Sequence, residues 1–330
     1  MRGKLLWALA LGFAIAAAAP ALSPARADEV VLNAVHFTPA QNAYAQSFLK
    51  FVEKVNERGK GIVQIKVRGG PEVVPPLQQG EAQKNGLIDM INTPAGLYLE
   101  LAPEGEVFSA TGKSVSDVRE NGGWELISKI YAEKANAHLL AHVDAGAGFH
   151  VFTVKEPAKT DNGGIDWSAL TIRSAPLYRD FLEALGATVI VQSPGEIYTS
   201  LERGVVNANA YTVFGYKSFG WDKFTKYRID PSFFVTDVLV SMNQKKWESL
   251  SPEAQKILTD VALEHELESA TANAEATVTQ GQQMIDEGQT VVTLGETAAA
   301  DFLAKAAEAS WKRMNERDPT HIEALRALFQ

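Results

Sequence analysis

The sequence predicts an α/β protein of two similar lobes that are braced by one long helix. Apolar runs typical of strands alternate with segments typical of helices along most of the chain. A break at 144–148 separates two series of this alternation, and helix formers then run almost unbroken from 253 to 285. Such alternation is typical of a mostly parallel sheet, so we expect one sheet in each lobe.

The first 27 residues have the pattern of a secretory signal peptide. Arg2 and Lys4 precede an apolar stretch over 5–19, and Ala25-Arg26-Ala27 matches a cleavage site. The apolar stretch is shorter than the ~20 residues that a helix needs to span a bilayer. The chain has no cysteine, so no lipid anchor is expected after cleavage. We therefore expect a soluble periplasmic protein that begins near Asp28.

The chain is acidic, and loss of the leader would make it more so. The formal charge is −9, and cleavage would remove three cations, Arg2, Lys4 and Arg26, with no acid. A strongly acidic surface repels nucleic acid and anionic lipid, which excludes these partners. An anionic ligand would have to be met by cationic groups held locally, inside a cleft.

The first lobe is predicted to comprise residues 28–148 together with 237–275. Thr38 before Pro39 has the pattern of a helix N-cap, and the alternation of Val63, Ile65 and Val67 predicts a strand. The expected elements are a helix from Thr38 to Gly59, a strand over 63–67, a helical stretch up to 86, a strand over 87–91, a helix from Ser116 past Tyr131, and a strand over 139–143.

The second lobe is predicted to comprise 149–236 together with 276–330. Gly186 is expected to close a helix, since glycine is favoured just after a helix end. The expected elements are strands over 149–154, 170–173, 187–192, 205–208 and 290–294, and helices over 176–185, 194–203 and 296–329.

Three segments in the second half carry a recognisable signature. They are Leu170-Thr171-Ile172-Arg173, Leu185-Gly186-Ala187, and the run SPGEIYTSLERGVVN over 193–207. In order and spacing they resemble the DctP-type substrate-binding subunits of tripartite ATP-independent periplasmic (TRAP) transporters. Further similar patterns extend the resemblance over most of the mature chain: Pro103-Glu104, 119–122, Trp221 with 226–231, and 247–253.

This resemblance implies a two-lobed α/β fold of the periplasmic binding protein type (type II-like), with a hinge, a long bracing helix and a ligand between the lobes. Members of the family bind small organic acids without changing them chemically. They deliver the acid to two integral membrane permease subunits driven by an ion gradient. A binding protein is therefore expected rather than an enzyme, with no cofactor and no metal, and as a monomer.

Arg173 matches the family arginine that grips the ligand carboxylate. It also ends an apolar strand, which is where open α/β sheets place ligands. A guanidinium offers paired donors that suit a carboxylate. The alternative interpretation is an ion pair with an acid of the protein itself, between the lobes.

His150 stands where relatives that bind diacids or sugar acids often carry a second arginine. The stretch here is Gly148-Phe149-His150, and a histidine cannot form the bidentate fork. This predicts a monocarboxylate whose hydroxyl or keto group His150 can bind. Two alternatives stay open: His150 only packs at a strand end, or the ligand is a C4-dicarboxylate or sugar acid.

Tyr211 occupies the position of an asparagine or tryptophan that touches the ligand in relatives. A phenol offers a flat apolar face and a polar tip, which suits an aromatic or short apolar body. The alternative is that Tyr211 is an ordinary core aromatic. Further candidates are drawn from strand ends and helix starts: Phe37, Thr38, Asn92, Tyr98, Phe149 and Tyr178.

A secreted hydrolase is the competing interpretation. The chain lacks a Gly-x-Ser-x-Gly nucleophile motif, and His265-Glu266 is not followed by a second histidine that would complete a zinc site. That pair is interpreted as a solvated helix face. A glycine-rich phosphate loop is also missing, which argues against nucleotide chemistry.

Overall fold

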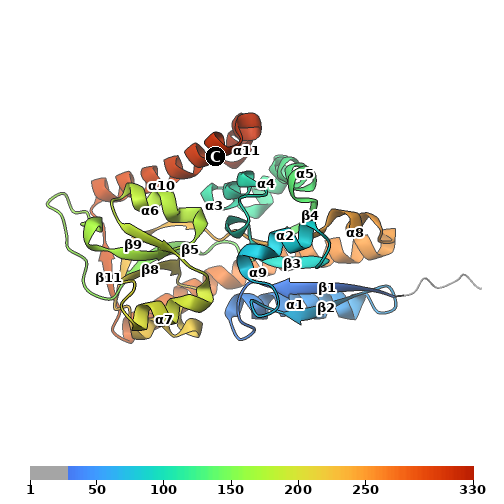
Figure 1. Ribbon diagram of the computed structural model, residues 1–330, viewed down its shortest axis with the longest axis horizontal. Coiled ribbons are helices and arrows are strands. Elements are labelled where there is room, and N and C mark those ends of the chain that lie inside the picture. The colour runs from blue at the N-terminus through green and yellow to red at the C-terminus, as the bar shows by residue number, and fades with distance from the viewer. Residues whose placement is uncertain (1–28) are drawn as a thin grey trace, which may run out of the picture.

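The computed structural model describes residues 29–330, and the predicted signal peptide, 1–27, lies outside the described residues. Two α/β units lie side by side, each built around its own sheet (Figure 1). The long helix α9 (Pro252–Asp286) runs lengthwise across both units. Within residues 29–330, every helix is too short or too polar to cross a membrane.

The first unit contains a five-stranded sheet in the order β2-β1-β3-β10-β4. β1 pairs with β2 and β3 in parallel, whereas β10 is antiparallel to both of its neighbours. The strands are β1 (Val30–His36), β2 (Val63–Gly69), β3 (Met90–Pro94), β4 (Ala137–His142) and β10 (Val238–Asn243).

The second unit contains a six-stranded sheet in the order β11-β9-β5-β8-β6-β7. Here β5 is antiparallel to both β8 and β9, and the other pairs are parallel. The strands are β5 (Gly148–Thr153), β6 (Thr171–Ser174), β7 (Thr188–Val191), β8 (Ala208–Thr212), β9 (Tyr227–Val235) and β11 (Thr290–Thr293).

Both sheets are thus mixed, where the sequence predicts mostly parallel ones. The chain passes from the first sheet to the second between β4 and β5, and returns between β9 and β10. A strand that arrives from the other unit needs no crossover helix on its own sheet, so it is free to run antiparallel. β9 and β10 are not among the strands that the sequence predicts.

Helices cover these sheets and connect their strands. They are α1 (Ala43–Arg58), α2 (Gln79–Lys84), α3 (Val107–Ala110), α4 (Val115–Glu120), α5 (Gly123–Ala135), α6 (Arg179–Ala184), α7 (Ile197–Glu202), α8 (Gln244–Glu248), α9, α10 (Glu296–Arg317) and α11 (Ile322–Phe329). On α1, the predicted apolar face of Phe48, Phe51, Val52 and Val55 is buried.

The bracing helix α9 begins where the sequence predicts. The Ser251 hydroxyl accepts a hydrogen bond from the Ala254 amide, and Pro252 occupies the first helical position. The helix contacts α1 and β4 in the first unit. Near its other end, Gly281 approaches Arg228 and Val213 of the second unit. The predicted two-lobed fold with a long bracing helix is confirmed.

The predicted division of the chain between lobes assigns 276–330 to the second. α10 does pack on α6 and β9 of that unit, but it also contacts α3, and α11 contacts α3 and α5 of the first unit. The lobe boundaries stay a prediction.

Two strands begin later than predicted, for one physical reason. In the predicted strand 87–91, the amides of Leu87 and Ile88 bond back to the Ala82 carbonyl and close α2, so β3 starts only at Met90. Likewise Val205 and Val206 bond to the Ser200 carbonyl and close α7, so β8 starts at Ala208 rather than Val205. When apolar residues close the end of a helix in this way, their sequence has the same pattern as the start of a buried strand.

The predicted helix from Ser116 past Tyr131 is two helices. Ser114, not Ser116, caps α4, together with Asp117 in a reciprocal capping box. Gly122 has a φ of +87°, a left-handed backbone that interrupts the helix before α5.

The interpretation of His265-Glu266 as a solvated face is wrong. His265 and Glu266 are both buried, because α9 packs there against α1 and β4. Glu266 accepts two hydrogen bonds from the Arg119 guanidinium, at 2.6 and 2.8 Å, and one from the His142 amide.

Candidate functional site

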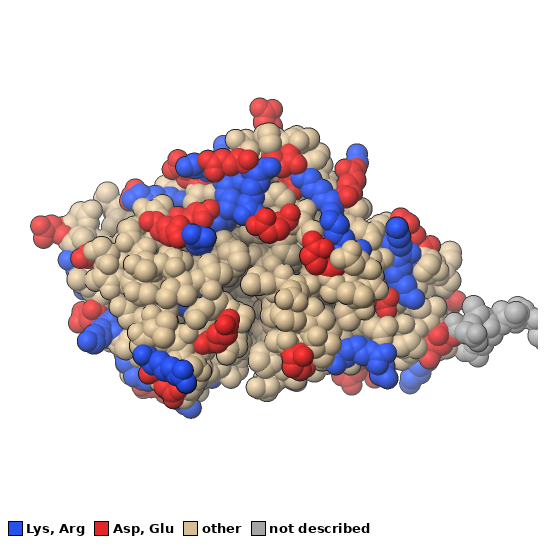
Figure 2. All heavy atoms as spheres, viewed as in Figure 1, with Lys and Arg blue, Asp and Glu red and all other residues tan. Residues whose placement is uncertain are grey.

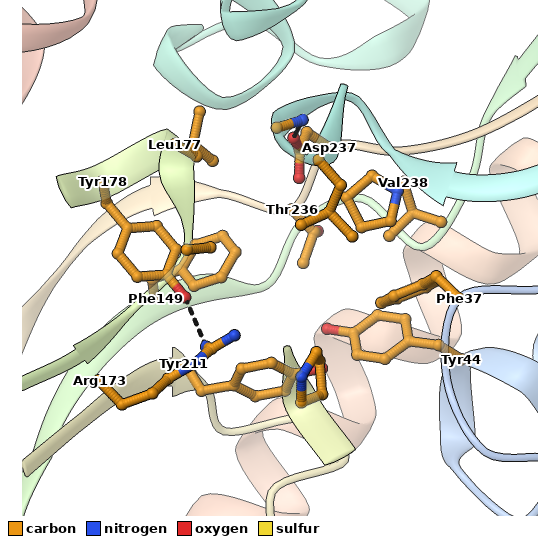
Figure 3. Close-up of a pocket in the computed structure, with 15 residues that line it drawn as sticks. Phe37, Tyr44, Phe149, Arg173, Leu177, Tyr178, Tyr211, Thr236, Asp237 and Val238 are labelled. Atoms are coloured by element: carbon orange, nitrogen blue, oxygen red, sulfur yellow. Dashed lines mark hydrogen bonds between the residues drawn. The ribbon is translucent and has the colours of Figure 1, made fainter. Parts of the chain in front are cut away.

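A pocket lies between the two units, at the carboxyl ends of several strands of both sheets (Figure 3). Its internal volume is about 50 Å³. The first unit lines it with Phe37, Tyr44, Pro94, Gly96, Leu97 and Val238, the second with Phe149, Arg173, Ala175, Leu177, Tyr178, Pro194 and Tyr211, and the returning connection with Thr236 and Asp237. On the molecular surface the two units meet along a hollow with few charges beside it, while charged side chains gather along the edge near α10 (Figure 2).

Arg173 is the basic residue of this pocket. It is the third residue of β6, whose neighbour Ile172 packs into the core, and only 1% of Arg173 is exposed. Its Nε donates to the Gln192 carbonyl at 2.9 Å, and Nη2 donates to the same oxygen. Nη1 donates to the Tyr178 hydroxyl at 3.0 Å, which in turn donates to the Ala210 carbonyl (Figure 3). All of these partners are electrically neutral.

Arg173 therefore carries a buried charge that the protein itself does not neutralise. None of the ion pairs formed among residues 29–330 includes Arg173, so the alternative of an ion pair with a protein acid is not found there. A guanidinium stays protonated in proteins, and burying an unpaired charge is costly. An anion in the pocket would supply the missing partner.

Five aromatic rings contribute to the remaining wall, those of Phe37, Tyr44, Phe149, Tyr178 and Tyr211. The Phe149 centroid lies 5.2 Å from that of Tyr178 and 6.4 Å from that of Tyr211. Tyr44 continues the series toward Phe37, with centroids 5.6 Å apart. Burial raises the pKa of all three tyrosines, Tyr44, Tyr178 and Tyr211. They are thus neutral phenols at pH 7, able to donate or accept a hydrogen bond.

Asp237 is a site residue that the sequence does not reveal. It lies between β9 and β10, and its Oδ2 accepts a hydrogen bond of 2.6 Å from the Gly96 amide. Burial raises the pKa of Asp237 to about 7, although the hydrogen bond from Gly96 acts in the opposite direction. Because neither flanking strand is predicted, no pattern in the sequence places this carboxyl in the pocket.

Five of the nine predicted site residues line the pocket together: Phe37, Phe149, Arg173, Tyr178 and Tyr211. His150 does not line it. Its Nδ1 lies 2.9 Å from Asp230 Oδ1 and 3.2 Å from the Ile229 carbonyl, both on the adjacent β9. Burial alone would raise the pKa of Asp230, but hydrogen bonds from His150 and Arg228 lower it to about 2. His150 is thus held by β9, and a contact between His150 and a ligand stays a prediction.

Thr38, Asn92 and Tyr98 also lie outside the pocket lining, all of them buried. Thr38 does not cap α1, because Asn42 does so by accepting from the Tyr44 amide at 3.0 Å. Asn92 lies inside β3, since that strand continues to Pro94.

Tyr98 packs edge-on against Tyr131 in the core of the first unit, with centroids 5.8 Å apart. In place of these three candidates, the first unit offers Pro94, Gly96 and Leu97 to the pocket.

Within residues 29–330, the histidines and acids do not gather in groups of three or more that could hold a metal ion. The pocket thus combines one buried arginine, one buried carboxyl and several aromatic rings.

Two α/β units that enclose a pocket with a buried, unpaired cation define a solute-binding protein of the two-lobed class. The sequence profile described as "Bacterial extracellular solute-binding protein, family 7", named DctP, matches residues 34–318. The chain belongs to this family. The resemblance to the DctP-type substrate-binding subunits of TRAP transporters is thereby confirmed.

Individual relatives are distant but cover the chain well. The ectoine-binding periplasmic protein TeaA of Halomonas elongata is 23% identical over 82% of this chain and 80% of its own. A solute-binding protein of Roseobacter denitrificans is 23% identical over 93% and 94%. The crystal structure of DctP7 of Bordetella pertussis, a receptor that binds pyroglutamic acid, has a TM-score of 0.78 at 15% identity, covering 91% and 99%. A structural likeness at such low sequence identity shows that the fold is shared. It does not identify the ligand of this chain.

Proposed function

We propose that this protein binds a small organic monocarboxylate between its two lobes and delivers it unchanged to the membrane subunits of a TRAP permease. The observation that carries the proposal is Arg173, a buried guanidinium without a protein acid to pair with. A carboxylate is the planar anion that the guanidinium fork fits best, and it would remove the cost of the unpaired charge.

One carboxylate suits the pocket better than two. Arg173 is the only lysine, arginine or histidine among the lining residues, and Asp237 would repel a second carboxylate. His150, a candidate for a second contact, is held by Asp230 instead. A sugar acid is disfavoured for another reason, because its hydroxyls need polar partners that the aromatic wall supplies only at the tyrosine hydroxyls. The C4-dicarboxylate and sugar-acid alternatives are therefore the weaker ones.

The side chains of the wall suit a compact, flat body. Phe149, Tyr178 and Tyr211 offer ring faces and edges on which an aromatic or small apolar ring can pack. The internal volume of about 50 Å³ is smaller than the roughly 150 Å³ of a cavity that holds one benzene ring, so the lobes must move apart even for a small acid. Ectoine and pyroglutamic acid, the ligands of TeaA and DctP7, are both small rings with one carboxylate. A hydroxy or keto substituent on the ligand would form a hydrogen bond with a tyrosine hydroxyl of the wall.

The same proposal covers the partners and the compartment. Export by the predicted leader 1–27 would place the chain in the periplasm, where a monomer would meet the two integral permease subunits. We infer no catalysis, because the family to which the chain belongs is one of solute-binding proteins.

Thermal-shift screening of organic acids tests the proposal. A monocarboxylate at a hundredfold excess over its dissociation constant should stabilise the protein by about 2.7 kcal/mol. Aromatic, 2-oxo, 2-hydroxy and dicarboxylic sets should be compared in parallel. Stabilisation by dicarboxylates alone would favour the alternative ligand class, and no stabilisation by any acid would refute the binding function.

A further inference from the structure

We propose that Asp237 is a second ligand contact, and that the bound acid therefore carries a nitrogen whose N–H, cationic or amide, donates to this carboxyl. This inference rests on the proposed function, because it concerns the same pocket. It narrows the ligand from a monocarboxylate to a nitrogen-bearing, often zwitterionic one.

Asp237 and Arg173 belong to different parts of the pocket wall. Figure 3 shows Asp237 beside Thr236 and Leu177, and Arg173 beside Tyr211 and Phe149. The two side chains do not form an ion pair with each other, since their charged atoms are more than 4.0 Å apart. A ligand that contacts both groups would have to be seated between them.

The Asp237 carboxyl keeps acceptor capacity for a ligand. Its Oδ2 accepts one hydrogen bond from the Gly96 amide, and the Asp237 backbone amide and the Ser109 hydroxyl also act on the carboxyl, whereas a carboxylate has about four acceptor sites. None of the ion pairs among residues 29–330 includes Asp237. The pocket thus contains two buried groups of opposite charge, neither of which has an ionic partner in the protein.

The backbone around Asp237 is held in place. The Asp237 carbonyl accepts from the Ala95 amide at 2.9 Å, and the Thr236 hydroxyl donates to the Asp144 carbonyl at 2.6 Å. The Thr236 carbonyl also lies 2.7 Å from His142 Nε2. The carboxyl is therefore preorganised, which limits the entropy lost when it binds a ligand.

A nitrogen donor fits this carboxyl better than a hydroxyl does. Burial raises the pKa of Asp237, so the ionised form is costly in the pocket without a counter-charge. A cationic N–H supplies that charge, and hydrogen bonds between ionised groups are roughly twice as strong as neutral ones. Neutral hydroxyls of a ligand are matched by the Tyr211 hydroxyl, which needs no counter-charge.

The alternative is that Asp237 only holds the turn at Gly96. Asp237→Asn separates the two roles, because the amide oxygen still accepts from the Gly96 amide but the charge is lost. Asp89→Asn is the matched control. The Asp89 carboxylate also accepts a hydrogen bond from a backbone amide, that of Asn33 at 2.8 Å, and Asp89 lies outside the pocket lining.

The experiment is titration calorimetry of the full mature chain with three five-membered-ring acids. L-Proline offers a cationic nitrogen, L-pyroglutamate offers an amide N–H, and cyclopentanecarboxylate offers neither. We expect at least one nitrogen-bearing acid to bind about tenfold or more tightly than cyclopentanecarboxylate. In Asp237→Asn this ratio of affinities should fall below about threefold, and in Asp89→Asn it should persist.

Three results would overturn the inference while leaving the proposed function intact. The first is equal affinity for all three acids, and the second is a preference that survives in Asp237→Asn. The third is a screen in which only nitrogen-free acids, hydroxy acids among them, stabilise the protein. If no carboxylate of any kind binds, the proposed function itself fails, so the two failures are distinguishable.

Discussion

Two buried arginines of this protein, Arg313 and Arg173, differ in whether an acidic side chain pairs with them. Arg313 on α10 is 7% exposed and is fully engaged: it donates to Glu106 at 2.5 and 2.8 Å and to Asp180 at 3.0 Å. It also donates to the carbonyls of Pro176 and Leu177. Arg173 is buried even more deeply, yet its partners are two carbonyls and one phenol.

The difference indicates what each arginine is for. Arg313 joins Glu106 of the first unit to the Pro176–Leu177 turn of the second, and Leu177 lines the pocket. Its charge is neutralised by the protein, so it holds the two units together. Arg173 is neutralised by nothing in the described chain, so its charge is available to a ligand. The following changes test this comparison.

Arg313→Met should have the largest effect, on stability. Removing one partner of a buried ion pair costs about 3–5 kcal/mol, because Glu106 is left buried and unpaired. Chemical denaturation of the ligand-free protein measures the loss. Arg179→Met, which breaks an exposed pair with Glu183 on α6, is the control and should change stability by less than about 0.5 kcal/mol.

The same variant should respond to pH in a defined direction. Burial raises the pKa of Glu106, and Arg313 opposes this rise, so the pKa will rise further without the arginine. A folded-state pKa raised above the unfolded value gives stability at low pH that is lost as pH rises. The loss in free energy of unfolding caused by Arg313→Met should therefore be smaller at pH 5 than at pH 7.5. An equal deficit would show that Glu106 does not take up a proton.

Arg173→Gln should have the next largest effect, and on binding instead of stability. We expect affinity for the carboxylate to fall by at least about a hundredfold, roughly 2.8 kcal/mol, as measured by calorimetry. Arg173→Lys should recover only part of it, because lysine lacks the fork. The exposed Arg203→Gln should leave affinity unchanged. If Arg173→Gln instead destabilised the free protein as much as Arg313→Met does, the comparison would be wrong.

Gly96→Ala should weaken binding moderately by acting on the contact between the units. A Cβ at Gly96 would lie 2.8 Å from the Leu177 Cβ and 3.0 Å from Asp237 Oδ2, so the two walls must shift. Overpacking of this kind costs about 1–3 kcal/mol, and we expect affinity to fall about tenfold. Gly112→Ala, where a Cβ meets nothing within 4 Å, is the control. Unchanged affinity would mean that this contact does not limit closure.

His150→Gln should have the smallest effect on affinity, less than about threefold. The ring pairs with Asp230 on β9 and does not line the pocket. Calorimetry at pH 7.5 is sufficient to measure it. A loss comparable to that of Arg173→Gln would restore His150 as a ligand contact.

Local patterns were sufficient for much of this molecule. The Ser251-Pro252 start of α9, the apolar face of α1 and the strand–helix alternation all report on neighbours within a few residues. Prediction failed where an apolar residue had two possible uses, as at Leu87 and Val205, which close helices rather than open strands. It also failed at β9 and β10, whose antiparallel pairing depends on partners far away in the chain.

The sequence by itself determined the family and the two-unit α/β organisation and predicted Arg173 as a ligand contact, because these depend on local spacing and on the order of motifs within the chain. Only the tertiary structure decided which residues surround that arginine. It placed Asp237 in the pocket and tied His150 to Asp230, since both outcomes depend on how strands from distant parts of the chain pair. Whether a buried charge has a partner is likewise a property of the folded chain.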